Sequence, residues 1–305
     1  MHTSNIQYSG WDNNLQISNG SVELVITLDV GPRILSYKTT HGENVLKNYG
    51  EQLGKSGEAE WMIRGGHRVW IAPEDVSLTY VPDNSPVEHR IEGNRVHLVN
   101  PGVAPWGVKK EMTITLDETG SGVRIQHTLT NEGSKPIEVA SWGLSVMAPG
   151  GLEIIPLPPL GEHPRDLLPN RLMIAWPYTD FTDSRWQFGG RFITLLQTAD
   201  GMPTKLGLAH KEKWIGYLLR NALFIKQFAY EEGANYTDMG CNFETFSNSE
   251  MLEIESLGPV KNLVPGESTG HFECWNLFDV SKQPESLKET DLFDWVAPML
   301  KSAGL

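Results

Sequence analysis

Short segments of alternating apolar and polar residues, separated by turn residues, constrain the fold of this chain more than any other feature. In LQISNGSVELVITLDVGPRILSY (residues 15–37), Asn19-Gly20 and Gly31-Pro32 separate three such segments. Asn-Gly suits the backbone of a tight turn between paired strands. The same rhythm returns in the segments 111–147, 204–230, 241–257 and 269–278. No linker or fixed-period repeat interrupts it, so we predict a single antiparallel, all-β domain over residues 1–305.

Two stretches depart from the strand pattern. Residues 284–302 are predicted to form a helix on the outside of the sheets, because apolar residues recur there at helical spacing, at Leu287, Leu292, Trp295, Val296 and Leu300. The longest irregular stretch, PLPPLGEHPRDLLPN (156–170), lies in the middle of the chain, and we interpret it as a functional loop.

Charge and composition exclude several partners. The net charge of −13 argues against a nucleic-acid partner, because phosphate backbones are bound by clustered Lys and Arg. No run of 18 apolar residues is present to span a membrane, and the N-terminus lacks the pattern of a secretory signal. Cys241 and Cys274 do not make a disulfide framework, which favours the cytoplasm. A monomer and a homodimer both fit these bounds.

The segment EAEWMIRGGHRVWIAPED (58–75) is too polar for a core strand and too aromatic for an ordinary loop. These residue types suit a concave site for a polar, ring-shaped ligand, so we predict that Arg64, His67, Trp70 and Glu74 line one. Arg64 would offer a fixed fork of donors and Trp70 a stacking face. The alternatives are a structural ion pair for Arg64, a core position for Trp70 and a structural role for the lone histidine.

A second candidate site lies in CNFETFSNSEMLEIESLGP (241–259). A two-residue turn at 248–249 would place Glu244 opposite Glu253 in a hairpin. Strand alternation then puts four polar side chains on one face: Asn242, Glu244, Glu253 and Glu255. Crowded carboxylates are tolerated where a proton is shared or a cation is bound, and both cases shift pKa values toward acid/base work. The alternative is a solvated face with a slipped register.

Other candidates are less specific. Lys226 shares a strand face with two phenylalanines, where it could hold a ligand oxygen or extend from a surface strand. Trp106 and Trp142 lie beside glycines, prolines or charges, where an indole can support a sugar ring. The sequence contains no zinc-ligand spacing, no Gly-rich phosphate loop and no hydrolase nucleophile motif. We therefore expect neither a metal nor another cofactor.

Three motifs in order resemble the galactose-mutarotase-like (aldose 1-epimerase) superfamily. IRGGHRVWIAPED is similar to the Arg-Gly-Gly-x-x-x-x-Trp segment of hexose-6-phosphate mutarotases, and LDVGPRILSY to an N-terminal strand-turn-strand of the superfamily. LEIESLGPVKNLVPGES resembles the late strand that carries the catalytic glutamate. The resemblance covers residues 14–279 and implies a β-supersandwich that binds a small-molecule sugar on a concave face. It places Glu253 on the catalytic glutamate, with Glu255 two residues on.

One departure from the family pattern concerns the general acid. The superfamily's mutarotases carry a histidine on a middle strand, whereas VASWGLSVMAPGG offers Trp142 and Ser145 there. His67 or His163 would have to substitute. Three functions stay open: a mutarotase or epimerase using Glu253, Glu255 and His67; a glycoside hydrolase or lyase; and a non-catalytic sugar-binding protein. The last predicts glutamates that are bound to Arg or Lys.

Overall fold

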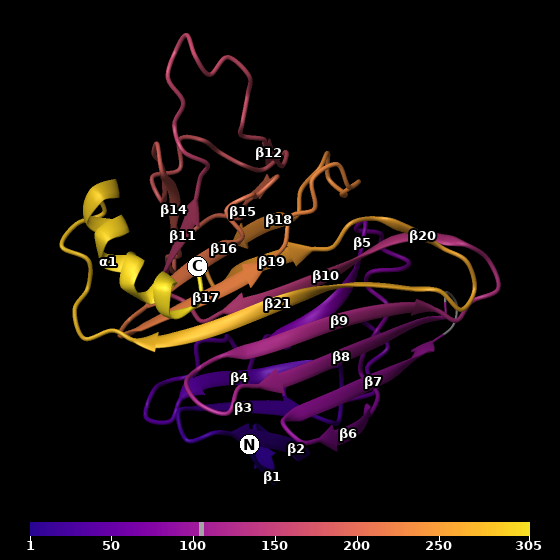
Figure 1. The fold of residues 1–305 in the computed structure, drawn as a ribbon. Helices are drawn as coiled ribbons and strands as arrows, with labels where there is room; N and C mark the ends of the chain where they lie inside the picture. Colours follow the sequence, from indigo (N-terminus) through magenta and orange to yellow (C-terminus); the bar gives the residue numbers. More distant parts are fainter. Residues whose placement is uncertain (104–106) are drawn as a thin grey trace.

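Two large antiparallel sheets lie face to face in the computed structural model, which describes residues 1–103 and 107–305 (Figure 1). The first sheet has the order β1 (His2–Tyr8), β2 (Trp11–Ser18), β3 (Val22–Thr27), β4 (Arg33–Thr39), β5 (His67–Ala72), β10 (Ile137–Met147), β19 (Leu252–Leu257), β18 (Phe243–Ser247), β15 (Thr204–Leu208) and β12 (Met173–Ala175), and β20 (Lys261–Leu263) pairs with β10. The second has the order β13 (Trp186–Phe188), β14 (Phe192–Leu196), β11 (Leu152–Pro156), β16 (Trp214–Leu219), β17 (Ala222–Phe228), β21 (Ser268–Asp279), β9 (Val123–Asn131), β8 (Val108–Leu116), β7 (Arg95–Val103) and β6 (Glu88–Glu92).

The main hydrophobic core fills the space between the sheets. Alternate residues of each strand point inward, so that Leu24 and Ile254 of the first sheet join one buried cluster with Ile114 and Phe224 of the second. The all-β fold predicted from the sequence is confirmed. The strands fold this way because their alternation supplies one apolar face to the core.

Helix α1 (Glu289–Ser302) packs on the outer face of the second sheet, as predicted. It begins at Glu289 and not at residue 284, because the Ser286 hydroxyl accepts the backbone N–H of Lys288 and holds the preceding residues in a turn. Leu292, Val296 and Leu300 form its buried stripe, whereas Leu287 precedes the helix and is exposed.

The predicted loop (156–170) leaves the body of the molecule. Figure 1 shows the chain between β11 and β12 projecting beyond both sheets. Its apolar residues Leu160, Leu167 and Leu168 are exposed. The segment returns through β12 to Trp176, which covers the first sheet beside Gly207. Its functional role stays a prediction.

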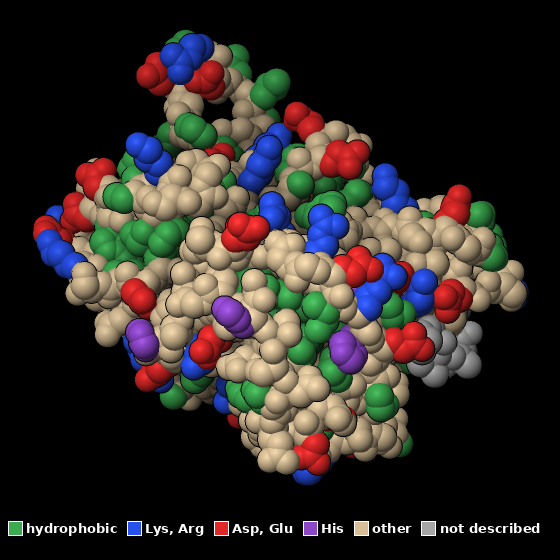
Figure 2. All heavy atoms as spheres, turned by 60° about the horizontal axis from the view of Figure 1, so that its bottom comes forward, with side chains coloured by type: hydrophobic (Ala, Val, Ile, Leu, Met, Phe, Trp, Pro, Cys, Tyr) green, Lys and Arg blue, Asp and Glu red, His purple; other side chains and the backbone are tan. Residues whose placement is uncertain are grey.

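The charges on the surface are mixed. On the face of the described residues that Figure 2 shows, Lys and Arg side chains alternate with Asp and Glu and do not gather into one basic patch. In the part of the chain that the structure describes, no helix has the length and apolar character needed to cross a membrane.

The close approach of the two sheets generates a prediction at Gly143, on the inner face of β10. A Cβ atom at this position would lie 2.3 Å from Oε1 of Glu273 and 3.1 Å from Cε1 of His127, both buried side chains of the second sheet. Gly143→Ala should therefore lower the free energy of unfolding by about 1–3 kcal/mol. Chemical denaturation measures this loss. The control is Gly216→Ala, where the added Cβ would meet its nearest neighbour at 3.4 Å, an ordinary contact; equal losses in both variants would contradict the prediction.

Candidate functional site

The outer face of five central strands of the first sheet carries a group of charged side chains. Strand register lines up Arg68, Leu144, Glu255 and Glu244 directly across β5, β10, β19 and β18. A neighbouring line across β19, β18 and β15 contains Glu253, Phe246 and Lys205. We call Arg68, Lys205, Glu244, Glu253 and Glu255 the outer-face charges.

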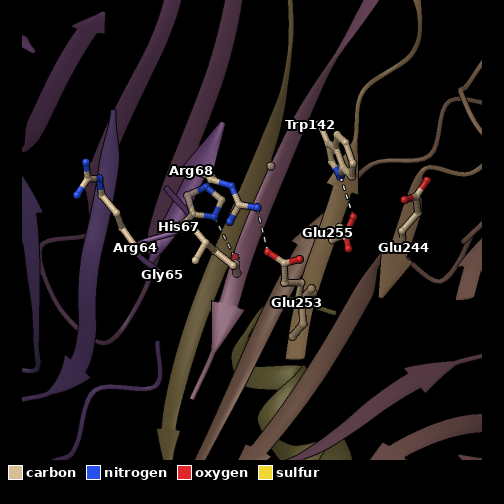
Figure 3. Close-up of polar contacts among 12 residues, drawn as sticks. Arg64, Gly65, His67, Arg68, Trp142, Glu244, Glu253 and Glu255 are labelled. Carbon is tan, nitrogen blue, oxygen red and sulfur yellow. Dashed lines mark hydrogen bonds and ion pairs between the residues drawn. The ribbon is translucent and has the colours of Figure 1, made fainter. Parts of the chain in front are cut away.

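Arg68 and Glu253 form one half of the site. They point toward each other from β5 and β19, on either side of β10, and Nη2 of Arg68 donates to Oε1 of Glu253 at 3.0 Å (Figure 3). Two indoles accompany the guanidinium, at 4.2 Å for Trp70 and 5.2 Å for Trp61, measured to the ring centroids. Such cation–π contacts fix the orientation of Arg68. Its Nε and Nη1 atoms have no hydrogen-bond partner among the described residues.

Lys205 organises the other half. Its ammonium lies 2.6 Å from Oε2 of Glu244 and 3.2 Å from Oε2 of Glu255. It is also placed between the rings of Trp142 and Trp176, at 5.0 and 4.7 Å. The indole N–H of Trp142 donates to Glu255 at 3.1 Å (Figure 3). Two carboxylates therefore share one cation inside an aromatic wall.

Burial decides the protonation of these carboxyl groups. It raises the pKa of Glu255 to about 7, although Lys205 opposes the shift. It also raises the pKa of Glu244 well above its usual value, again against Lys205. Both carboxyl groups therefore hold a proton more readily than an exposed glutamate does. Glu253 differs because 8 % of its surface is exposed, against 1 % for Glu255 and none for Glu244.

The predicted hairpin register is corrected by two residues. Glu244 lies opposite Glu255, and Phe246 lies opposite Glu253. The turn spans four residues instead of two, because the Asn248 side chain accepts the backbone N–H groups of Glu250 and Met251. A register shift of two residues leaves each side chain on the same face of the sheet. Glu244, Glu253 and Glu255 therefore share one face, as strand alternation predicts.

Arg64 does not join this site, and its prediction as a ligand-binding residue is not supported. Its guanidinium donates to Glu58 at 2.6 Å and points away from Glu253 (Figure 3). Arg64, Gly65 and Gly66 all have positive φ, at 52, 87 and 73°, which turns the chain before β5 begins. The strand alternation that would have aligned Arg64 with Arg68 is lost in this turn.

His67 and Lys226 lie on the other side of the first sheet, between the two sheets. His67 alternates with Arg68 on β5, so its ring points inward, where Nε2 lies 2.8 Å from Nε2 of His127. Lys226 reaches across from β17 and donates to the backbone oxygens of Gly143 and Ile254. The prediction that His67 shares a site with Glu253 is not supported, because the two side chains point to opposite faces of the first sheet. The ammonium of Lys226 is held between the sheets, so it neither lies on a surface strand nor is open to a ligand oxygen.

These inward side chains form a buried polar network around Glu273 of β21. Lys226 lies 2.9 Å from Oε1 of Glu273, which also accepts the Ser256 hydroxyl at 2.5 Å. The indole of Trp275 donates to Oε2 at 2.8 Å. Burial would raise the pKa of Glu273, but Lys226 and then His67 outweigh it and hold the pKa well below its usual range. The network is a charged pair surrounded by neutral donors and acceptors.

The same network contains three groups with the spacing of metal ligands. One atom each of His67, His127 and Glu273 lies within 4.8 Å of the others. The donor set does not suit a divalent cation, because Lys226 already neutralises Glu273. A dication would add two uncompensated charges to a buried site, which is strongly unfavourable. We therefore assign the cluster a structural role.

The remaining predicted residues have three different outcomes. Trp70 and Trp142 lie on the outer face in ring contact with each other, and the exposed Glu74 accepts the Tyr80 hydroxyl at 2.5 Å beside them. Asn242 is buried, and the backbone of His210 and Ala229 occupies its amide, so it is not free for a ligand. Trp106 lies outside the described residues.

Sequence reasoning missed Arg68 and Lys205. Arg68 stands two residues before Trp70, so alternation in HRVWIA could have placed both on one face. Lys205 lies in TKLGLAH, where no local pattern marks it. The aromatic residues Trp61, Tyr80, Trp176 and Tyr178 come from loops, and only the tertiary fold brings them to the site.

Solved structures share this architecture at low sequence identity. No protein-family model and no curated protein matches the chain. A galactose mutarotase-like protein from Lactobacillus casei superposes with a TM-score of 0.56 at 13% identity, over 87% of this chain and 100% of that one. A second from Clostridium acetobutylicum gives 0.56 at 11% identity, over 92% and 98%. The Slr1438 protein of Synechocystis gives 0.59 at 12% identity, over 90% and 99%.

The buried histidines generate a pH prediction. Burial lowers the pKa of His127 to about 3, below the usual value of about 6.5. As the pH falls below 6.5, the unfolded chain takes up a proton that the folded chain refuses, so stability is lost on acidification. His127→Gln should remove about 2 kcal/mol of the loss between pH 7 and pH 5. Denaturation at both pH values measures it, with the exposed His89→Gln as control; an unchanged pH dependence in His127→Gln would contradict a neutral buried ring.

Proposed function

We propose that this chain, which has the galactose-mutarotase-like fold, binds a sugar on the outer face of β5, β10, β19, β18 and β15 and exchanges protons at its anomeric centre. The observation that carries the proposal is the position of Glu253, the most exposed of the three glutamates. Arg68 donates a hydrogen bond to the Oε1 atom of Glu253, and no described residue forms a hydrogen bond with the Oε2 atom. A general base needs such a positioned and reachable oxygen.

The surroundings of Glu253 suit a sugar. Trp61 and Tyr80 are partly exposed and pack edge to face with each other, against the buried Trp70, and they offer apolar surface to the C–H face of a pyranose ring. The Oε2 atom of Glu253, with which no described residue forms a hydrogen bond, can accept one from a sugar hydroxyl. Both kinds of contact are needed to hold and orient a polar ring.

The proposed reaction opens and recloses the sugar ring. Glu253 accepts the proton of the anomeric hydroxyl, the bond between C1 and the ring oxygen breaks, and the ring oxygen takes up a proton. Rotation about the C1–C2 bond and reversal of these steps give the other anomer. Trp142 lies on the middle strand where the superfamily carries a histidine, so water supplies the second proton. The reaction is therefore slower by the factor of roughly 10²–10⁴ that a positioned general acid contributes.

Sugar binding without catalysis is the second candidate function. It is favoured by the cation that each outer-face glutamate already contacts, since Arg68 binds Glu253 and Lys205 binds Glu244 and Glu255. A carboxylate that is paired with a cation can still accept a hydrogen bond from a sugar hydroxyl without taking its proton. No observation in the described residues favours the hydrolase or lyase alternative.

Glu253→Gln separates the two candidates. The amide keeps the shape and the contact with Arg68 but cannot accept the proton, so the rate should fall to the spontaneous value while the sugar affinity changes less than about threefold. Polarimetry or NMR of freshly dissolved α-glucose and α-galactose measures the rate, and calorimetry measures the affinity.

Glu255→Gln should reduce the rate less, because Glu255 contacts Lys205 and Trp142 and is almost fully covered. Glu118→Gln, an exposed change after β8, is the control for the loss of one negative charge. A wild-type protein that binds an aldose without accelerating its mutarotation would favour the non-catalytic function. A protein that binds no sugar would overturn the proposal.

A further inference from the structure

We propose that the sugar recognised at this site carries no negatively charged group, so that neutral aldoses are accepted and sugar phosphates and uronates are rejected. This inference rests on the proposed sugar-binding function. It is derived from the partners of each charge at the site and from the charges around it.

Both cations of the outer-face charges are already neutralised. Arg68 pairs with Glu253, and Lys205 lies within 3.2 Å of both Glu244 and Glu255. An anionic ligand that approached either cation would meet the carboxylate that accompanies it. Neither half of the site therefore has a net positive charge with which to compensate a phosphate or carboxylate for its lost hydration.

The surroundings of the site are acidic as well. Three tyrosines, Tyr49, Tyr80 and Tyr178, lie around the outer-face charges, and charged side chains lie near their hydroxyl groups. Among the described residues these include two cations, Arg68 and Lys205, and six carboxylates, Glu51, Glu74, Glu244, Glu250, Glu253 and Glu255. Lys47, which lies 4.9 Å from the ring centroid of Tyr49, adds one more cation.

Glu51, Glu74 and Glu250 are exposed and lie near Tyr49 or Tyr80, and we call this acidic rim of the site the entrance. These three carboxylates outnumber the single cation Lys47. The potential at the entrance is therefore negative even where Glu244 or Glu255 carries a proton. The chain as a whole adds to it, with a net charge of −13. A dianionic phosphate approaching this entrance is repelled, whereas a neutral hydroxyl ligand is not.

The guanidinium of Arg68 is not available to an anion. Nη2 donates to Glu253, Nε and Nη1 are buried, and Trp61 and Trp70 accompany the group. The more exposed group is Glu253, whose Oε2 atom can accept from a neutral hydroxyl and repels an anion. A phosphate-binding site would be expected to use a guanidinium that is not already paired with a carboxylate.

Matched ligand sets test the inference. Calorimetric titrations compare glucose with glucose 6-phosphate, glucuronate and glucosamine, and galactose with galactose 6-phosphate and galacturonate. We expect the phosphates and uronates to bind at least about tenfold more weakly than the parent sugar, and glucosamine no more weakly than glucose. Added salt should narrow the difference, because it screens the charges at the entrance.

A pair of variants attributes the effect to the entrance. Glu51→Gln combined with Glu250→Gln should improve binding of the 6-phosphates by about threefold or more and leave the neutral sugars unchanged. Glu88→Gln combined with Glu118→Gln makes the same change in net charge at exposed positions on the second sheet and beyond β8. This control should leave both ligand classes unchanged.

The outcomes separate the two proposals. Binding of a 6-phosphate or uronate as tightly as the parent sugar would overturn this inference and leave the sugar-binding function intact. The same result would follow if both double variants changed discrimination equally. Failure of every sugar in both sets to bind would overturn the proposed function and this inference with it.

Discussion

The ion pair between Lys226 of β17 and Glu273 of β21, on neighbouring strands of the second sheet, lies directly behind the candidate site. Both side chains are fully buried, 2.9 Å apart, in the space that the hydrophobic core otherwise fills. A buried charge without its partner is strongly destabilising, so the two charges have to stay together. Hydrogen bonds from Lys226 to Gly143 and Ile254, and from Ser256 to Glu273, join the pair to the first sheet. Ser145, Ser256 and Trp275 satisfy the remaining polar atoms.

The network also reaches the backbone of the strands that carry the outer-face charges. Lys226 donates to the oxygens of Gly143 and Ile254, and Ile254 separates Glu253 from Glu255 on β19. Successive side chains of a strand point to opposite faces. The inner network and the outer site are therefore built on alternate residues of the same strands. The position of Glu253 therefore depends on polar contacts that no ligand touches.

On the outer face, each charge is held by a partner of opposite sign and a wall of aromatic rings. Such a site has little to attract ions, and in the proposed function its specificity comes from hydroxyl hydrogen bonds and ring stacking. A neutral polyol fits these contacts, and the acidic entrance strengthens the selection against anions. This arrangement agrees with a sugar as ligand and with a modest catalytic role for Glu253 at most.

The sequence by itself determined the all-β architecture, the helix at the C-terminus and the sharing of one strand face by Glu244, Glu253 and Glu255. Alternation and turn residues are local properties, and they carry this information directly. Only the tertiary structure decided that His67 and Lys226 point inward and that Arg68, and not Arg64, lies beside Glu253. Polar residues line both faces of β5, β10 and β19, so alternation shows which residues share a face but not which face is buried. That choice depends on which face the second sheet covers, and no single strand contains that information.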